Sequence, residues 1–336
     1  MYGCRFKVLL ALAGSVAVLA AAPSPVLGQD GYTPPRTAFG QPDLSGIWTN
    51  NSATPLQRPE QLAGKARLSD EELAELTRKI DEFRDAEQAG DLLGDRLIQQ
   101  ALGNPEFQDF DVITGNYNAF WLVERHLDHR TSLIIDPPDG RIPPLTEKAA
   151  ARAAERRAYA AEHPSDGPED RTLGDRCLHF DAPRIGSGYN SYFQLVQTPT
   201  HVAIFQEMGH FTRIIPVDGR LHIDDDVRQW AGDARGRWEG DTLVVETTHY
   251  SPQTRFSGAT ENLRLVERYT RISPGVLRQE ITLHDADTWT RPWTIELLHT
   301  ATTDPIFEYA CHEGNYSMPG ILGGARLEER EAAAGR

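Results

Sequence analysis

The residues best suited to chemistry surround a short turn, where Glu207 and His210 are followed by Arg213. Met208 and Gly209 separate the carboxylate from the imidazole, so both side chains could project toward one end of a hairpin. A carboxylate beside a histidine is the minimal acid–base pair, because it fixes the tautomer of the ring and raises its basicity. The alternative is a surface hairpin on which both side chains are solvated.

A second group of reactive side chains follows the last expected strand. Its members are Cys311, His312, Glu313, Asn315 and Tyr316. Loops on a rigid scaffold often carry functional residues, and this segment also contains Gly314. We expect His312 or Glu313 to supply the acid that opposes the pair at the turn, and Tyr316 to contact the ligand. A loop that is pinned for stability alone is the alternative.

Aromatic and amide side chains that could hold a flat or ring-shaped ligand lie in two further segments. They are Tyr117, Asn118, Trp121, Tyr189 and Asn190. Core packing is the other common use of such aromatic residues. Glu207, Glu267 and Gln279 are polar residues on strand faces that are otherwise apolar, and such groups need a partner, water or a ligand. Glu267 and Arg213, which lies on the strand after the turn, are also expected to contact the ligand. A ligand cavity with apolar walls and a buried hydrogen-bond network both fit this pattern.

The N-terminus has the pattern of a secretory signal peptide. Arg5 and Lys7 precede an apolar run over residues 8–22, and a cleavage site with small residues ends at Gly28. The run is about 15 residues long, whereas a membrane span needs roughly 20. We therefore expect residues 1–28 to be removed, leaving a periplasmic or secreted chain without a membrane span.

Two cysteines remain in the expected mature chain, Cys177 and Cys311. In an oxidising compartment they most simply form a disulfide that closes a long loop. A cysteine nucleophile or a thiolate metal ligand is the alternative, since His312 follows Cys311 directly. The histidines are too dispersed to predict a metal site by spacing. The acidic run 224–226 lacks the ligand pattern of an EF-hand, so a solvated turn fits it better than a calcium site.

Composition excludes several classes of function. The formal charge of the 336-residue chain is −15 at pH 7, so a phosphate backbone would be repelled and nucleic-acid binding is not expected. The motifs of α/β-hydrolases, P-loop NTPases, thermolysin-like proteases and Rossmann dehydrogenases are all missing from the sequence. We therefore expect a small-molecule ligand or substrate and no cofactor, with the oligomeric state left open.

Helical patterns precede residue 165, and short strands dominate after residue 192. Ser69 and Glu72 form a capping box before an amphipathic stripe, and a second helix is expected after Thr146. Residues 44–48 are a candidate first strand. Eight later runs of β-formers are separated by turn residues. They are 193–198, 201–207, 211–217, 242–249, 263–272, 276–284, 293–299 and 306–311.

Consecutive hairpins predict an antiparallel meander, and a long sheet of this kind tends to close on itself. The predicted fold is therefore mainly β: a lipocalin-like barrel, closed or nearly closed, with an N-terminal helical segment. Residues 29–336 are expected to form one barrel domain with a helical insertion at about 68–164.

Four motifs resemble those of a large family of exported bacterial proteins. They are GQPDLSGIW (40–48), RTSLIIDPPDGR (130–141), GRWEGDTL (236–243) and ACHEGNY (310–316). The resemblance covers nearly all of the expected mature chain and implies an exported protein. It supplies no mechanism, so function rests on the residues themselves.

These residues predict an enzyme that binds a hydrophobic or polyphenolic small molecule in a barrel cavity. The expected chemistry is acid–base catalysis without a cofactor, of lyase, hydratase or isomerase type. One alternative is a non-catalytic ligand-binding protein of lipocalin type, which needs a closed apolar cavity rather than converging titratable groups. A second is a glycoside hydrolase that uses Glu207 with Glu267, whose carboxyl groups would lie roughly 5–9.5 Å apart.

Overall fold

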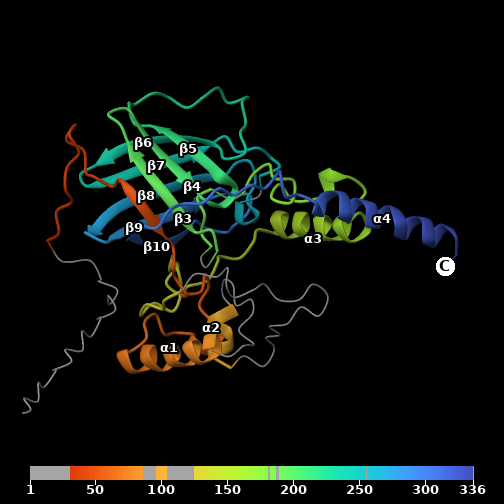
Figure 1. Cartoon of the computed structure of the whole chain (residues 1–336), viewed down its shortest axis with the longest axis horizontal. Coiled ribbons are helices and arrows are strands. Elements are labelled where there is room, and N and C mark those ends of the chain that lie inside the picture. Colours follow the sequence, from red (N-terminus) through yellow and green to blue (C-terminus); the bar gives the residue numbers. More distant parts are fainter. Residues whose placement is uncertain are drawn as a thin grey trace, which may run out of the picture.

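The computed structural model describes residues 31–85, 96–103, 125–180, 182–186, 189–254 and 256–335. The expected signal peptide and three expected ligand-binding residues, Tyr117, Asn118 and Trp121, lie outside these residues. The described chain is mainly β, with few helices and one antiparallel sheet of 10 strands (Figure 1). The strands are β1 (Gly46–Thr49), β2 (Ile134–Asp136), β3 (Tyr192–Gln197), β4 (His201–Gln206), β5 (Phe211–Pro216), β6 (Asp233–Glu239), β7 (Thr242–Thr248), β8 (Arg264–Ser273), β9 (Val276–His284) and β10 (Trp293–Thr302).

The order of strands in the sheet is β5-β4-β3-β1-β10-β9-β8-β7-β6, with β2 pairing to β10. All but the last of the expected meander strands correspond to strands of the structure, with ends that differ by a few residues. Segment 306–311 forms no ladder, and β6 was not expected. The short β1 lies between β3 and β10, so the N-terminal strand joins two halves of the meander.

The sheet is not closed into a barrel, which corrects the predicted closure. The outermost strands, β5 and β6, share no hydrogen-bonded ladder. Val217 N donates to Thr200 O on the β4 side at 2.8 Å. Because successive backbone nitrogens of a strand point to opposite sides, the nitrogen of Pro216 faces the open edge of the sheet. Proline has no N–H there to donate to another strand. Close packing joins β5 and β6 instead: the Val217 side chain lies against the backbone of Gly236, where an added Cβ would be only 2.7 Å away.

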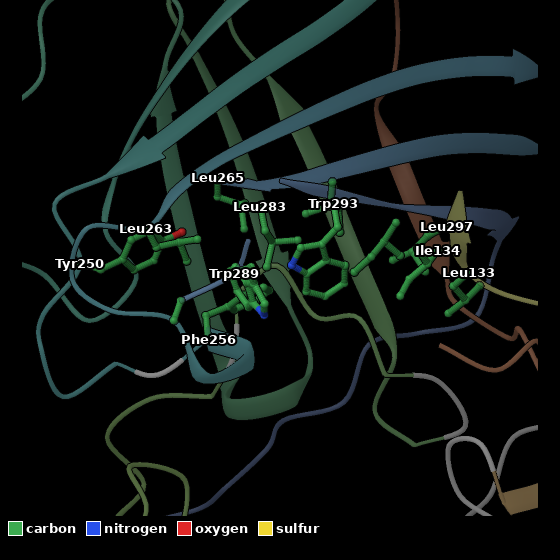
Figure 2. Packing of buried hydrophobic residues seen from close by; sticks show 13 residues of the cluster. Leu133, Ile134, Tyr250, Phe256, Leu263, Leu265, Leu283, Trp289, Trp293 and Leu297 are labelled. Carbon is green, nitrogen blue, oxygen red and sulfur yellow. The ribbon is translucent and has the colours of Figure 1, made fainter. Parts of the chain in front are cut away.

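One face of each central strand is buried, as the alternation of residue types predicts. On β9, Leu277, Gln279, Ile281 and Leu283 are all at most 2% exposed. Around them the curled sheet packs an apolar core, part of which is shown in Figure 2. In this core the rings of Trp289 and Trp293 pack edge to face, with their centroids 5.4 Å apart. A rigid, packed scaffold of this kind can hold side chains at its ends in fixed positions.

The helices lie outside the sheet (Figure 1). They are α1 (Asp70–Asp85), α2 (Arg96–Ala101), α3 (Glu147–Glu162) and α4 (Ser317–Ala333). The expected capping box begins α1, since Ser69 Oγ accepts from Glu72 N at 3.2 Å and Ser69 N donates to the Glu72 carboxylate at 2.9 Å. Among the described residues, no helix is long and apolar enough to cross a membrane.

Candidate functional site

A cleft of 1080 Å³ lies at the end of the sheet where β3 begins and β4 ends. Its walls come from segment 172–180, from the residues around the start of β3, and from segment 304–317, which follows β10. Figure 1 shows this last segment running from the sheet toward α4. Tyr189, Asn190, Glu207 and Asn315, all expected site residues, line the cleft.

A disulfide between Cys177 and Cys311 closes one side of the cleft, as the sequence predicts. It joins positions separated by 134 residues, with a Cα–Cα distance of 5.7 Å that is ordinary for a disulfide. Asn315 adds a polar tie beside it, because its Nδ2 donates to Asp175 O at 2.9 Å. The C-terminal wall is therefore fastened to the loop that precedes β3.

Glu207 follows β4 directly and is only 4% exposed, although it lines the cleft. Burial raises the pKa of its carboxyl group, and the backbone N–H groups of Phe307 and Tyr192 and the charge of Arg184 oppose that rise without cancelling it. The Phe307 N–H donates to Glu207 Oε1 at 3.4 Å. Within the described ranges, no Lys, Arg or His forms an ion pair with this carboxylate.

The turn after Glu207 requires a glycine. Gly209 has φ of 73°, and a Cβ there would lie 2.4 Å from the Phe180 ring. Glycine therefore serves two purposes: it permits the left-handed backbone and lets Phe180, which lines the cleft, pack against the turn. The glycine thus fixes the shape of the turn that follows Glu207.

His210 is exposed and does not line the cleft. Its Nδ1 accepts from Tyr309 N at 3.5 Å, and its ring meets Phe205 edge to face at 4.8 Å. Glu207 and His210 thus hold alternate backbone N–H groups of one extended segment. In the part of the chain that is described, their side chains form no hydrogen bond with each other, so the expected carboxylate–imidazole contact is not observed.

The structure separates the second expected group. Asn315 lines the cleft, whereas His312, Glu313 and Tyr316 are exposed, Tyr316 to 83%. None of these three lines the cleft. The structure therefore does not place His312 or Glu313 opposite Glu207.

Arg213 and Glu267 lie inside the curled sheet rather than in the cleft. Arg213 Nη1 donates to Glu267 Oε1 at 3.0 Å, and the exposed fractions of the two side chains are 5% and 0%. Burial alone would lower the pKa of the Arg213 guanidinium, but the charge and hydrogen bonds of Glu267 outweigh it and raise that pKa. Tyr269 also donates to Glu267 Oε1, at 2.6 Å. The two charges satisfy each other.

The interior network continues to a buried histidine. Gln279 Nε2 donates to Glu267 Oε1 at 3.0 Å, so the Gln279 Oε1 faces His299 Nε2, which lies 2.8 Å away. His299 must therefore carry its proton on Nε2, and burial lowers its pKa to about 3. The cavity beside this network measures only 30 Å³. These polar faces form the buried network rather than the walls of a large ligand cavity.

A histidine that sequence analysis missed borders a second cleft of 730 Å³. His179 is 7% exposed, and burial, together with the charge of Arg213, lowers its pKa to about 4. Thr172, Gly174 and Phe180 line both clefts, so segment 172–180 separates them. The only sequence signal was that His179 lies two residues from a cysteine.

Comparisons with known proteins identify no relative. No protein-family model matches the chain, no curated protein is significantly similar to it, and no solved structure is significantly similar to it. The chemistry of the cleft is therefore the basis on which a function can be assigned.

Proposed function

We propose that the chain is an exported enzyme in which Glu207 transfers a proton to or from a small molecule held in the 1080 Å³ cleft. One observation carries this proposal: the Glu207 carboxyl is almost fully buried, has a raised pKa, and lines an open cleft. Perturbed carboxyl groups in clefts are candidate catalytic acids and bases, because a raised pKa brings proton exchange closer to neutral pH.

The lining of the cleft favours an aromatic ligand that carries hydroxyl groups. Phe180, Tyr189 and Tyr309 offer ring surfaces, while Asn190 and Asn315 offer amide groups. Aromatic rings stack on flat ligands, and a few polar groups fix their orientation. A polyphenol has both features, so we propose lyase, hydratase or isomerase chemistry on a molecule of this class.

His210 is proposed as the second proton-transfer group, at the rim. Its exposure gives it access to solvent protons, and its contact with Tyr309 N places it beside a residue that lines the cleft. In this arrangement Glu207 acts on the buried part of the ligand, while His210 exchanges protons with water.

Two observations favour this function over the alternatives. A lipocalin-type carrier would need a large internal cavity, whereas the interior cavity at the network measures 30 Å³. A glycoside hydrolase that pairs Glu207 with Glu267 would need both carboxylates on one cleft, but Glu267 is bound to Arg213 and does not line it. Export itself is supported by the disulfide, which fits an oxidising compartment.

Mass spectrometry of compounds that co-purify with the chain from an exporting host would supply substrates for the test. With a substrate in hand, Glu207→Gln should lower kcat by about 10²- to 10⁴-fold, the contribution typical of a general acid or base. Glu308 lines the same cleft but is exposed, so Glu308→Gln is the matched control and should retain wild-type kcat. Wild-type turnover by a folded Glu207→Gln variant would refute the proposal.

A further inference from the structure

A cluster of two histidines and an aspartate lies outside the cleft that Glu207 lines. His222 belongs to the loop after β5, Asp233 begins β6, and His249 directly follows β7. One ligand atom from each residue lies within 4.8 Å of the other two. Neither sequence spacing nor the proposed cleft chemistry accounts for this arrangement.

The candidate ligand atoms lie close to one another. His222 Nδ1 lies 2.7 Å from Asp233 Oδ2. The hydroxyl of Thr248 lies 2.7 Å from His249 Nδ1 and 3.5 Å from His222 Nδ1. The Nδ1 atoms of both imidazoles therefore face the Thr248 hydroxyl, and Asp233 Oδ2 lies beside the Nδ1 of His222.

A carboxylate lies within hydrogen-bond distance behind His249, and another lies farther from His222. His249 Nε2 lies 3.1 Å from Asp225 Oδ1, and His222 Nε2 lies 4.0 Å from Glu246 Oε1. Metal-binding histidines generally donate their second ring N–H to a carboxylate, which fixes the tautomer and raises the basicity of the coordinating nitrogen. In the structure the Nδ1 atoms of His222 and His249 hydrogen-bond to Asp233 Oδ2 and to the Thr248 hydroxyl, respectively. An ion would replace both hydrogen bonds once each ring carries its proton on Nε2.

The remaining oxygen of Asp233 is also held in place. Arg235 Nη1 donates to Asp233 Oδ1 at 2.6 Å, which leaves Oδ2 as the oxygen on the histidine side. Asp233 is 6% exposed, whereas the His222 side chain is 26% exposed. The site is therefore buried on its aspartate side and open to solvent on its His222 side, as an entry path for an ion requires.

The backbone on two sides of the cluster adopts the left-handed region. Gly232 has φ of 66°, and a Cβ there would lie 2.5 Å from Thr248 O. His249 has φ of 60°, which is uncommon for a residue with a side chain. Such conformations persist where surrounding contacts impose them, and they gather at ligand sites. Here they bring the loop before β6 against the end of β7.

We propose that His222, Asp233 and His249 bind a zinc-class divalent transition-metal ion, which fastens the loop between β5 and β6 to the end of β7. Two imidazole nitrogens and one carboxylate oxygen are ligands that Zn²⁺ accepts, with a fourth position open. Calcium and magnesium prefer sets made of oxygen atoms, so the two nitrogens select against them.

The test uses the full chain without a histidine tag, stripped with a chelator and dialysed. Elemental analysis after incubation with Zn²⁺ should give one equivalent per chain, and Co²⁺ should bind at the same site with visible d–d absorption. Removing a carboxylate behind a metal-bound histidine typically weakens affinity about 10- to 100-fold, so Asp225→Asn should fall in this range. His222→Gln and His249→Gln, which remove ligands, should each lose more than about 100-fold.

His163 provides the matched control. Its Nδ1 lies 2.7 Å from Asp166 Oδ2, the same separation as in the His222–Asp233 pair. Among the described residues, no third His, Cys, Asp or Glu lies close enough to share an ion with this pair. His163→Gln should therefore keep wild-type affinity. Should Asp233→Asn fail to fold, the two histidine variants decide the question, with circular dichroism to confirm that they are folded.

Three results would overturn the proposal: less than one-tenth of an equivalent of Zn²⁺ at saturation, equal affinity in wild type and both histidine variants, or tighter binding of Ca²⁺ than of Zn²⁺. None of these outcomes depends on the activity assigned to Glu207, so the two proposals can fail separately.

Discussion

Glu267 and Glu207 are both buried carboxyl groups, but their surroundings differ. Glu267 is fully buried and has the Arg213 guanidinium, the Tyr269 hydroxyl and the Gln279 amide as hydrogen-bond partners. Glu207 faces an open cleft, and burial raises its pKa. A buried charge whose partners satisfy it serves the fold, whereas one that is left partly uncompensated beside a cleft is available for chemistry.

The largest expected effect comes from neutralising Glu267. In Glu267→Gln, Arg213 would remain buried without a counter-charge, and breaking a buried pair in this way costs about 3–5 kcal/mol of the free energy of unfolding. Urea unfolding at neutral pH measures it. Glu239 pairs with Arg268 at the surface, where both side chains are 40% exposed, so Glu239→Gln should leave the free energy of unfolding nearly unchanged. Equal losses in the two variants would remove the distinction between the two environments.

A disulfide holds the walls of the cleft together, whereas side-chain packing holds the interior of the sheet together. Replacing both Cys177 and Cys311 by serine should lower the free energy of unfolding by about 2–4 kcal/mol, since the unfolded chain loses its cross-link. We also expect a lower affinity for substrate, because the disulfide at Cys311 holds the wall of the cleft that contains Asn315. Urea unfolding with and without a reductant checks the first effect. A reductant should destabilise the wild type and leave the double variant unchanged.

Acid should affect the interior network through His299. Burial lowers the folded-state pKa of His299 to about 3 from 6.5, so between these pH values the unfolded chain binds a proton that the folded chain excludes. Stability due to this group is therefore complete above pH 6.5 and falls as the pH drops toward 3, by at most about 1.4 kcal/mol per pH unit. His179, with a folded-state pKa of about 4, adds a similar slope.

Unfolding midpoints at pH 6.5 and pH 4.5 measure this slope, which should become shallower in His299→Gln. His163 is the control, because its hydrogen bond to Asp166 raises its pKa. A histidine with a raised pKa makes stability depend on pH only above its unfolded-state pKa. His163→Gln should therefore leave the change in stability between pH 6.5 and pH 4.5 as it is in the wild type. An unchanged slope in His299→Gln would mean that the network does not hold this histidine neutral.

Local signals predicted much of this architecture. The alternation on β8 and β9 identified the buried faces, and the Ser69–Glu72 pair identified the start of α1, because both patterns depend on neighbours in the chain. Cys177 and Cys311 could be paired from the expected compartment and their number alone. The position of β1 between β3 and β10 could not be predicted, since it depends on contacts between distant segments.

Where the prediction was wrong, tertiary contacts decided the outcome. Segment 306–311 is rich in β-formers, yet side chains hold it: the Glu207 carboxylate and the His210 ring accept its N–H groups, and a disulfide ends it. By contrast, β6 lacks β-former alternation and contains Gly236, but β7 pairs with it along its whole length. The His222 cluster was missed because a loop closes it, and loop positions have no periodicity.

The smallest expected effect is also the sharpest test of the opening comparison. Because the folded-state pKa of Glu207 is raised, its contribution to stability is complete below the unfolded value of 4.5 and is lost as the pH rises through the folded-state value. At pH 7 the charged carboxylate therefore destabilises the fold. Glu207→Gln removes that charge and keeps a carbonyl oxygen for the Phe307 N–H, so stability at pH 7 should rise by less than about 1 kcal/mol.

The same substitution thus has opposite signs at the two buried carboxyl groups: Glu267→Gln destabilises strongly, and Glu207→Gln stabilises slightly. Differential scanning calorimetry of both variants at pH 7 and pH 4 resolves the two signs, and the gain in Glu207→Gln should vanish at pH 4, where the wild-type carboxyl is protonated. A loss of stability in Glu207→Gln at pH 7 would show that the carboxylate is needed to hold segment 304–317. Glu207 would then belong with Glu267 as a structural group, and the cleft would need another residue for its chemistry.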